Sequence, residues 1–170
     1  MKKIMVCMMV ALGTTSLAMA QTDSKFKFSF GPELSLATGA FSDTHSFGIG
    51  GSVQAEVLLQ EHLYGTATFG IIAYNGKSIP YTSQKATGQI IMPLRVGAKY
   101  FFGGGFYGAA QIGVGILNNY YTGTAFSYSP QLGYEFKTKT DKAIDASFKY
   151  DGYSKNGTLG AVGVRIAYIF

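Results

Sequence analysis

The last nine residues, 162–170, alternate strictly between apolar and mixed side chains and finish on an aromatic ring. The even positions are all apolar, whereas the odd positions include Gly163 and Arg165. A period of two is typical of a β-strand that has one apolar face. A terminal strand frays in a soluble domain, whereas a barrel that closes through its last strand needs that strand complete. This ending therefore predicts a membrane barrel.

Residues 1–20 have the pattern of a secretory signal peptide. Two lysines follow the first Met, an apolar stretch covers residues 4–12, and Ala18–Ala20 has the small-x-small pattern of a cleavage site. A transmembrane helix is the alternative, but the apolar stretch is shorter than the roughly 20 residues that span a bilayer. We expect residues 1–20 to be cleaved and residues 21–170 to form one barrel domain.

The composition excludes several classes of protein. The single cysteine, Cys7, lies in the segment expected to be cleaved, so neither a disulfide nor a cysteine metal site is predicted. The chain carries 14 Lys and Arg against 9 Asp and Glu, and the basic residues are scattered singly, which argues against a nucleic-acid partner. After residue 20 no apolar run is long enough for a spanning helix, while 12 Tyr, 13 Phe and 23 Gly in the whole chain suit a β-barrel.

Eight segments of the remaining sequence alternate with a period of two. They cover residues 25–37, 47–59, 63–74, 89–100, 106–117, 125–136, 142–151 and 162–170. An even number of antiparallel strands is typical of bacterial outer-membrane barrels.

The connections between these segments alternate in character. Those near residues 60, 103 and 139 are short, and those near 41, 80, 121 and 155 are longer or more polar. Outer-membrane barrels have short turns on the periplasmic side and longer loops outside. The predicted fold is all-β: an eight-stranded antiparallel up-and-down transmembrane β-barrel with short periplasmic turns, longer outer loops and both termini in the periplasm.

Aromatic residues gather near the ends of the predicted strands, where amphipathic rings favour the lipid–water interface. The predicted lower girdle comprises Phe26, Tyr100, Phe106, Tyr134, Phe136, Tyr168 and Phe170. The predicted upper girdle comprises Phe47, Tyr74, Phe126, Tyr128, Phe148 and Tyr150.

Three prolines, Pro32, Pro93 and Pro130, lie inside predicted strands. Proline has no N–H to donate to a β-ladder, and a closed barrel has no free edge where that loss would go unnoticed. We therefore expect each proline to mark a β-bulge or a strand end.

The alternation alone does not show which face lies inside, because a soluble lipocalin-like barrel would bury its apolar face. The apolar face is nearly unbroken and bulky, while the other face mixes Gly, Ala, Ser and charge. Eight strands enclose room for side chains only, so the small and polar set is expected inside and the bulky set in lipid. The glycines at 97, 113 and 163 are expected to let long lumen residues such as Tyr64 or Arg165 lie flat against the wall.

Eight charged residues are thereby predicted to share the lumen. They are Glu33, Glu56, Glu135 and Asp145, with Arg95, Lys99, Lys149 and Arg165. An unpaired charge in a narrow lumen costs on the order of several kcal/mol, so opposite signs are expected to pair. A selectivity ring in a pore is the alternative, but it would repeat one sign on many strands. The balanced signs favour a plugged lumen.

Residues 90–102 form a proline-leucine strand with an aromatic exit, and Gly103 and Phe106–Ala110 follow as a hairpin. This segment resembles the outer-membrane β-barrel domain family often labelled the porin family, and the mature region is similar to small barrels of the outer-membrane protein A and X type. The resemblance implies an outer-membrane location, with membrane lipid and the barrel insertion machinery as partners. It also implies that Tyr168 and Phe170 form the C-terminal signature that this machinery reads.

Asp43, His45 and Ser46 are the strongest catalytic candidates, because some eight-stranded outer-membrane barrels edit lipid A with a His and a Ser or an acid near the outer rim. A base and a nucleophile must meet at hydrogen-bond distance with a third group orienting them, so neighbours within one loop are weak support. His62 beside Glu61 has less support still. With no metal-binding, phosphate-binding or serine-elbow motif, we expect no catalysis, metal or cofactor.

The predicted function is therefore structural, or interaction at the cell surface with an unidentified ligand or protein partner. A small passive pore is the first alternative. A lipid A-modifying enzyme that depends on His45 is the second, and a soluble periplasmic barrel that carries an apolar ligand is the third.

Overall fold

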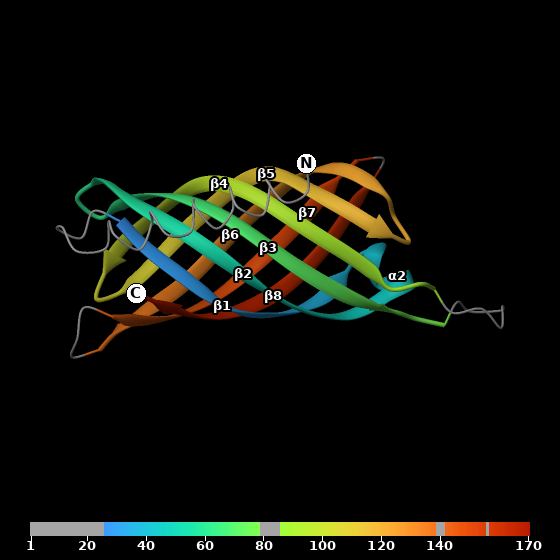
Figure 1. The fold of residues 1–170 in the computed structure, drawn as a ribbon, viewed down its shortest axis with the longest axis horizontal. Helices are drawn as coiled ribbons and strands as arrows, with labels where there is room; N and C mark the ends of the chain where they lie inside the picture. Colours follow the sequence, from blue (N-terminus) through green and yellow to red (C-terminus); the bar gives the residue numbers. More distant parts are fainter. Residues whose placement is uncertain (1–25, 79–85, 139–141, 156) are drawn as a thin grey trace, which may run out of the picture.

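The computed structural model describes residues 26–78, 86–138, 142–155 and 157–170; the predicted signal peptide lies outside this part. In these described ranges, eight strands and one four-residue helix make up the fold (Figure 1). They are β1 (Phe26–Thr38), α2 (Phe41–Thr44), β2 (His45–Gln60), β3 (Leu63–Gly76), β4 (Gln89–Gly103), β5 (Phe106–Asn119), β6 (Gly123–Lys137), β7 (Ala143–Ser154) and β8 (Thr158–Ile169). In the described part of the chain, no helix is long and apolar enough to cross a membrane.

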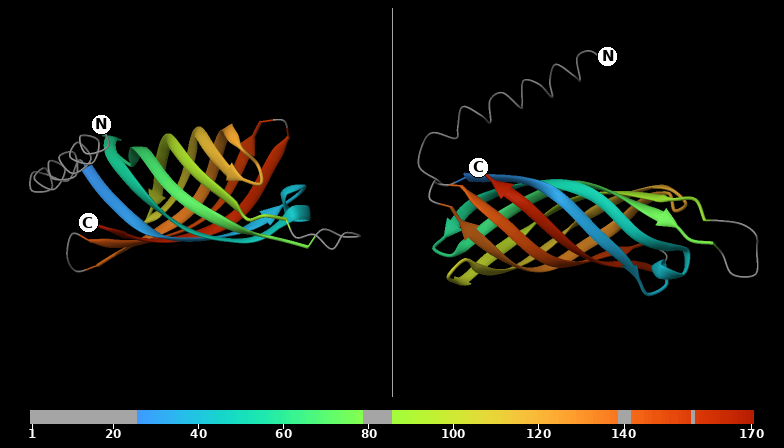
Figure 2. Two further views of the ribbon diagram at one scale, coloured as in Figure 1. Left: turned by 45° about the vertical axis from the view of Figure 1, so that its right-hand side comes forward. Right: turned by 90° about the horizontal axis from the view of Figure 1, so that it is seen from below.

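Each strand pairs antiparallel with the next, and β8 pairs antiparallel with β1 to close the barrel. Phe30 lies opposite Tyr168 and Leu36 opposite Val162 at this closing seam. The views in Figure 2 show the strands tilted around a common axis. The predicted eight-stranded up-and-down barrel is confirmed.

The two ends of the barrel differ. The end that holds the start of β1 and the C-terminus, which we name the terminal end, carries the turns 61–62 and 104–105 and the end of β6 and start of β7 (Figure 1). The opposite end, which we name the α2 end, carries the connections 39–44 and 120–122, the end of β3 and start of β4, and the end of β7 and start of β8. Both tight turns at the terminal end use left-handed backbone, with φ of 69° at His62 and 60° at Gly104.

The apolar face of every strand points away from the barrel axis. Phe28 and Ile166 are 42% and 58% exposed, whereas Glu33 and Arg165 are 1% and 4% exposed. Water would disfavour so large an apolar surface, because each exposed Å² costs about 25 cal/mol. The surface is stable against hydrocarbon, and strands of 12 to 16 residues exceed the roughly 9–11 that cross a bilayer. The barrel therefore spans a membrane, and the soluble lipocalin-like alternative is excluded.

The prediction that each proline marks a bulge or a strand end is wrong. Pro32, Pro93 and Pro130 lie inside β1, β4 and β6 and pair in unbroken register with Gly51, Gly115 and Ala110. Toward the other neighbouring strand, the ladder skips two pairs beside each proline and then resumes in the same register. A strand N–H points to one neighbour only, so losing it interrupts one ladder locally without shifting the strand.

Register shifts occur at strand ends instead. They lie between His45 and Gly48 and between Leu58 and Gln60 on β2, and between Phe101 and Gly103 on β4. Near the end of a strand, an irregularity disturbs little of the ladder that follows.

One member of the predicted upper girdle is misplaced. Tyr74 points into the lumen and is 2% exposed. It lies on the same face of β3 as Thr66 and Thr68, which are also buried. The other predicted girdle rings are half-buried or exposed on the outer face of the barrel.

The three lumen glycines do not make room for long side chains as predicted. A Cβ at Gly97 or Gly113 would meet the backbone of the neighbouring strand, so these glycines allow β4 and β5 to approach closely. A Cβ at Gly163 would lie 2.7 Å from Ser35 Oγ and 2.9 Å from the Leu34 carbonyl oxygen.

Other glycines do play the predicted role. The rings of the lumen residues Tyr74, Tyr107 and Tyr153 lie where a Cβ would stand on Gly48, Gly133 and Gly115, respectively. A tyrosine that covers a glycine restores the packing that the missing side chain would have supplied.

Candidate functional site: the filled lumen

Lys99 on β4 is the centre of an ion-pair network in the half of the lumen nearer the terminal end. Its Nζ lies 2.5 Å from Glu135 Oε1, 2.9 Å from Glu56 Oε1 and 3.6 Å from Asp145 Oδ2. The Tyr107 ring centroid lies 4.0 Å from the same Nζ, and the Tyr107 hydroxyl donates to Asp145 Oδ2 at 2.6 Å. One lysine thus joins β4 to β2, β6 and β7.

The network continues toward the α2 end. Arg165 Nη1 lies 3.5 Å from Asp145 Oδ1, and its Nε lies 3.7 Å from Glu33 Oε1. Lys149 Nζ lies 2.5 Å from Glu33 Oε2 and 3.2 Å from Asp151 Oδ2. Because Asp151 also binds Arg95, all these groups belong to one connected network.

The structure places all eight predicted lumen charges inside the barrel and brings them into this network. The sequence prediction missed two further members. Asp151 lies on the polar face of β7 beside Lys149, and Lys27, on β1, pairs with Glu135 at 3.2 Å. Both residues have the correct alternation, which could have identified them. The network then holds five cations and five carboxylates: Lys27, Arg95, Lys99, Lys149 and Arg165 with Glu33, Glu56, Glu135, Asp145 and Asp151.

Hydroxyl groups accept hydrogen bonds from further donors of the two arginines. Arg165 donates from Nε to Ser52 Oγ at 2.8 Å and from Nη2 to Ser29 Oγ at 2.9 Å. Arg95 donates from Nε to Ser127 Oγ at 2.7 Å and from Nη2 to the Tyr153 hydroxyl at 2.9 Å. Burying a charge is tolerated only when such bonds replace its water, so these serines and the tyrosine stabilise the guanidinium groups.

Two strands, β3 and β5, contribute no charge to the network and are joined by neutral polar groups. Gln111 Nε2 lies 2.9 Å from Thr68 Oγ1, 3.1 Å from Gln54 Oε1 and 3.2 Å from Thr66 Oγ1. Gln54 Nε2 in turn donates to Glu56 Oε1 at 2.7 Å. The amide and hydroxyl groups thus extend the ion pairs into one polar filling.

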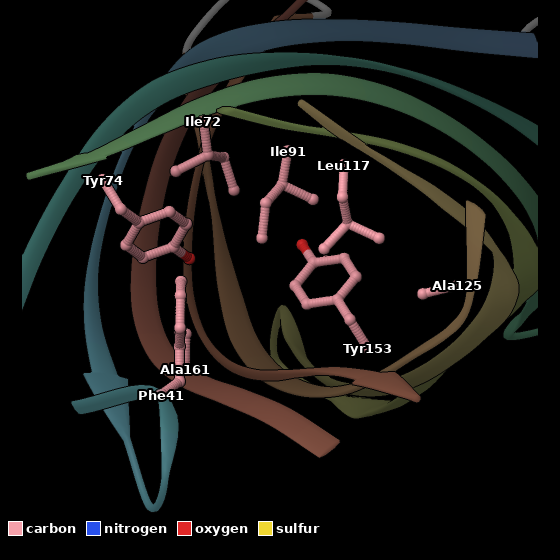
Figure 3. Packing of buried hydrophobic residues seen from close by; sticks show 8 residues of the cluster. All are labelled: Phe41, Ile72, Tyr74, Ile91, Leu117, Ala125, Tyr153 and Ala161. Carbon is pink, nitrogen blue, oxygen red and sulfur yellow. The ribbon is translucent and has the colours of Figure 1, made fainter. Parts of the chain in front are cut away.

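Near the α2 end the lumen lining becomes apolar, as Figure 3 shows. The cluster, which we name the apolar layer, comprises Phe41, Ile72, Tyr74, Ile91, Leu117, Ala125, Tyr153 and Ala161. The expectation of a small and polar interior is wrong at this level. The same alternation that points Thr68, Arg95 and Gln111 inward brings three apolar side chains of these strands inward here: Ile72, Ile91 and Leu117.

His45 does not form a catalytic set. It is fully buried; its Nε2 lies 3.1 Å from the Thr87 carbonyl oxygen and its Nδ1 lies 2.9 Å from Thr44 Oγ1. Because a carbonyl only accepts, Nε2 carries a proton and donates it to Thr87. Asp43 is exposed, so no carboxylate orients the ring from within the loop. His62 and Glu61 are exposed in their turn, and the described residues contain no His, Cys, Asp and Glu cluster that could hold a metal.

The C-terminal aromatics lie on the outer face beside the closing seam. Phe170 is exposed; its ring centroid is 6.3 Å from that of Phe30 and 5.0 Å from that of Tyr168. The Phe170 backbone N–H donates to the Phe28 carbonyl at 3.0 Å.

Solved structures with the same fold belong to small membrane barrels. Neisserial surface protein A is 13% identical with a TM-score of 0.65, over 86% of this chain and 96% of that protein. OprG from Pseudomonas aeruginosa is 10% identical with a TM-score of 0.59, over 85% of this chain and 95% of that protein. Ail of Yersinia pestis is 14% identical with a TM-score of 0.57, over 85% of this chain and 97% of that protein.

No protein-family model matches the chain, and no curated protein matches it in sequence. At these identities the structural likeness concerns the fold. The predicted resemblance to small eight-stranded outer-membrane barrels is thereby confirmed at the level of architecture, and the chain has the fold of those barrels.

Proposed function

We propose that the protein is an outer-membrane barrel with a structural or surface-interaction role and a lumen closed to solutes. One observation carries this proposal: the interior is crossed by a connected network of ion pairs with equal numbers of each sign, and the apolar layer lies beyond it. A conducting pore needs a continuous hydrated path, whereas these side chains bind one another.

The cellular location rests on three features. The outward surface is apolar on all eight strands. Residues 1–20 have the signal-peptide pattern. OprG, which shares the fold, is described as an outer membrane protein. In this setting the terminal end, with the start of β1 and the C-terminus, faces the periplasm, and the predicted location of both chain termini is periplasmic.

The proposed partners follow from this placement. Outer-membrane lipid covers the apolar face, and the barrel insertion machinery binds the C-terminal strand through Tyr168 and Phe170. The connections at the α2 end lie outside the cell, where they are available to a ligand or a protein. Neisserial surface protein A and the attachment invasion locus protein carry surface roles in their names, which supports a role of this class.

Planar-bilayer recordings test the closed lumen. The refolded wild-type protein is expected to give a flat current trace under conditions in which a general porin, refolded in the same way, gives steady channels. Steady conductance steps from the wild-type barrel that change when Arg95 or Arg165 is replaced would establish the small-pore alternative and refute the closed lumen.

An epitope inserted at 120–122 tests the orientation. Antibody should stain intact cells that carry this insertion, and it should reach an epitope at 104–105 only after the outer membrane is permeabilised. The reverse staining pattern would refute the orientation.

A further inference from the structure

Phe41 closes a gap in the apolar layer that the barrel wall leaves open. At this level β3 to β8 each contribute a side chain to the layer. On β1 and β2 the corresponding wall residues are small: Ala37 packs against the layer, and the ring of Tyr74 fills the place of a Gly48 side chain. Phe41 comes from α2, between β1 and β2, and is fully buried against the layer (Figure 3).

The phenyl ring of Phe41 is held by aromatic neighbours. Its centroid lies 4.9 Å from that of Tyr74 in an edge-to-face arrangement, 4.8 Å from the His45 ring and 6.4 Å from the Tyr121 ring. Such ring pairs contribute beyond the apolar area that they bury. The α2 segment is therefore fixed mainly by one inserted side chain.

Among the described residues, α2 has polar attachments to the strands at Lys77 and through the contact of Thr44 Oγ1 with the adjacent His45 Nδ1. Lys77 Nζ donates to the Ser42 carbonyl at 2.7 Å, and the Lys77 backbone N–H donates to the Thr44 carbonyl at 2.8 Å. The bonds of Ser42 to the Gly39 carbonyl stay within the segment. No side chain caps the N-terminus of α2. A four-residue helix held in this way is weaker than the ladders on either side of it.

Both ends of the segment have features of a hinge. Gly39 has a φ of +57°, a conformation that glycine adopts without strain, and no atom lies within 4 Å of the place of its Cβ. At the other end, His45 returns to extended backbone and is anchored through Thr87. Movement of residues 40–44 would leave both strands in place.

The polar filling lies beneath the apolar layer and does not depend on α2. Tyr153 connects the two levels, because its ring belongs to the layer and its hydroxyl accepts from Arg95. None of the ion pairs of the network involves a residue of α2. Withdrawal of Phe41 would therefore uncover the apolar layer from the α2 end while the ion pairs keep the barrel closed.

We propose that α2 is a hinged lid. Phe41 closes an apolar vestibule at the α2 end, and the bonds of Lys77 hold the lid shut. Opening the lid exposes this vestibule without opening a path through the barrel. The vestibule suits an apolar group of about the size of a phenyl ring, because that is the group it holds when the lid is shut. Lid opening makes the apolar layer accessible to a reagent in water, and this accessibility does not depend on whether the barrel conducts ions.

The test uses a single reporter cysteine, Ala125→Cys, in the apolar layer of the refolded mature barrel in lipid. A small charged methanethiosulfonate is added in water, and the labelling rate is followed by mass spectrometry. Lys77→Ala removes the Nζ bond to the Ser42 carbonyl and is expected to raise the labelling rate about tenfold, because α2 then loses a hydrogen bond from a charged group. Phe41→Ala is expected to raise it further.

Matched controls distinguish a lid from general loosening. Lys155→Ala removes an equivalent lysine-to-carbonyl bond at the same end, from Lys155 Nζ to the Thr122 carbonyl at 2.8 Å, without touching the lid. Phe47→Ala removes an exposed phenyl ring from the outer face. Both controls are expected to leave the rate unchanged. A second reporter, Gln111→Cys in the polar filling, is expected to stay unlabelled in every variant that migrates as a folded barrel on an unheated gel.

The lid is overturned if Lys77→Ala and Lys155→Ala change the Ala125→Cys rate equally. It is also overturned if Phe41→Ala leaves that rate unchanged. Equal labelling of Gln111→Cys and Ala125→Cys in the Phe41→Ala barrel would refute the closed floor beneath the vestibule.

Discussion

Arg95 on β4 donates from Nη1 to Asp151 Oδ1 on β7 at 2.7 Å, although β5 and β6 lie between these strands in the wall. Both side chains are 1% exposed. The bond crosses the lumen and joins parts of the barrel that no backbone ladder connects. Lys99 and Lys149 make bonds of the same kind to Glu135 and Glu33, and Arg165 on β8 reaches past β1 to Ser52 on β2, so the interior ties the wall together from within.

Asp151→Asn should destabilise the barrel strongly. The substitution leaves Arg95 and Lys149 without the charge that both contact, and breaking a buried pair costs about 3–5 kcal/mol. Reversible urea unfolding in phospholipid vesicles measures the change. The control is Asp43→Asn, at an exposed carboxylate in α2, where a change within about 0.5 kcal/mol is expected. Equal effects at the two positions would contradict a stabilising lumen network.

Leu94→Arg should weaken insertion. Leu94 points outward from the middle of β4 and is exposed, and a charged residue on the lipid face near the bilayer midplane costs about 2–4 kcal/mol. Leu94→Phe keeps the site apolar and serves as the control. The yield of folded barrel across a urea series compares the two. If both variants fold alike, this face does not lie in hydrocarbon.

Gly48→Ala should destabilise the α2 end through a single ring. A Cβ there would lie 2.6 Å from Cε1 of Tyr74, and overpacking of this kind costs about 1–3 kcal/mol. Combining it with Tyr74→Leu should recover part of the lost stability, because the effects of substitutions at two contacting residues do not simply add. Thermal unfolding of the two single variants and the double variant measures the coupling. Simple additivity would show that the ring does not restrict position 48.

Alternation in the sequence predicted much of the fold, because a strand period of two fixes which side chains share a face. It placed Phe28 and Ile166 outward and Glu33 and Arg165 inward, as the structure has them. It could not show which charges meet, since partners such as Arg95 and Asp151 depend on how the strands are staggered around the barrel.

The remaining errors have separate causes. The prediction placed Tyr74 in a girdle because it is aromatic and near a strand end. Its even position, however, puts it on the same face of the strand as Thr66 and Thr68. Pro93 was treated as if both neighbouring strands needed its N–H, whereas only one does. Phe41 lies in a segment without alternation, so its role in the apolar layer follows only from the closed barrel that surrounds it.

Nitroxide scanning of β8 from position 162 to 169 in lipid tests the central claim most directly. Oxygen collects in hydrocarbon, so labels at Val162, Val164, Ile166 and Tyr168 should collide with oxygen far more often than labels at Gly163, Arg165, Ala167 and Ile169. If the odd positions collided more often instead, the charges would lie in lipid and the apolar face at the axis. If the collision frequency did not alternate at all, β8 would not cross the bilayer as a barrel strand. Either result would contradict the account.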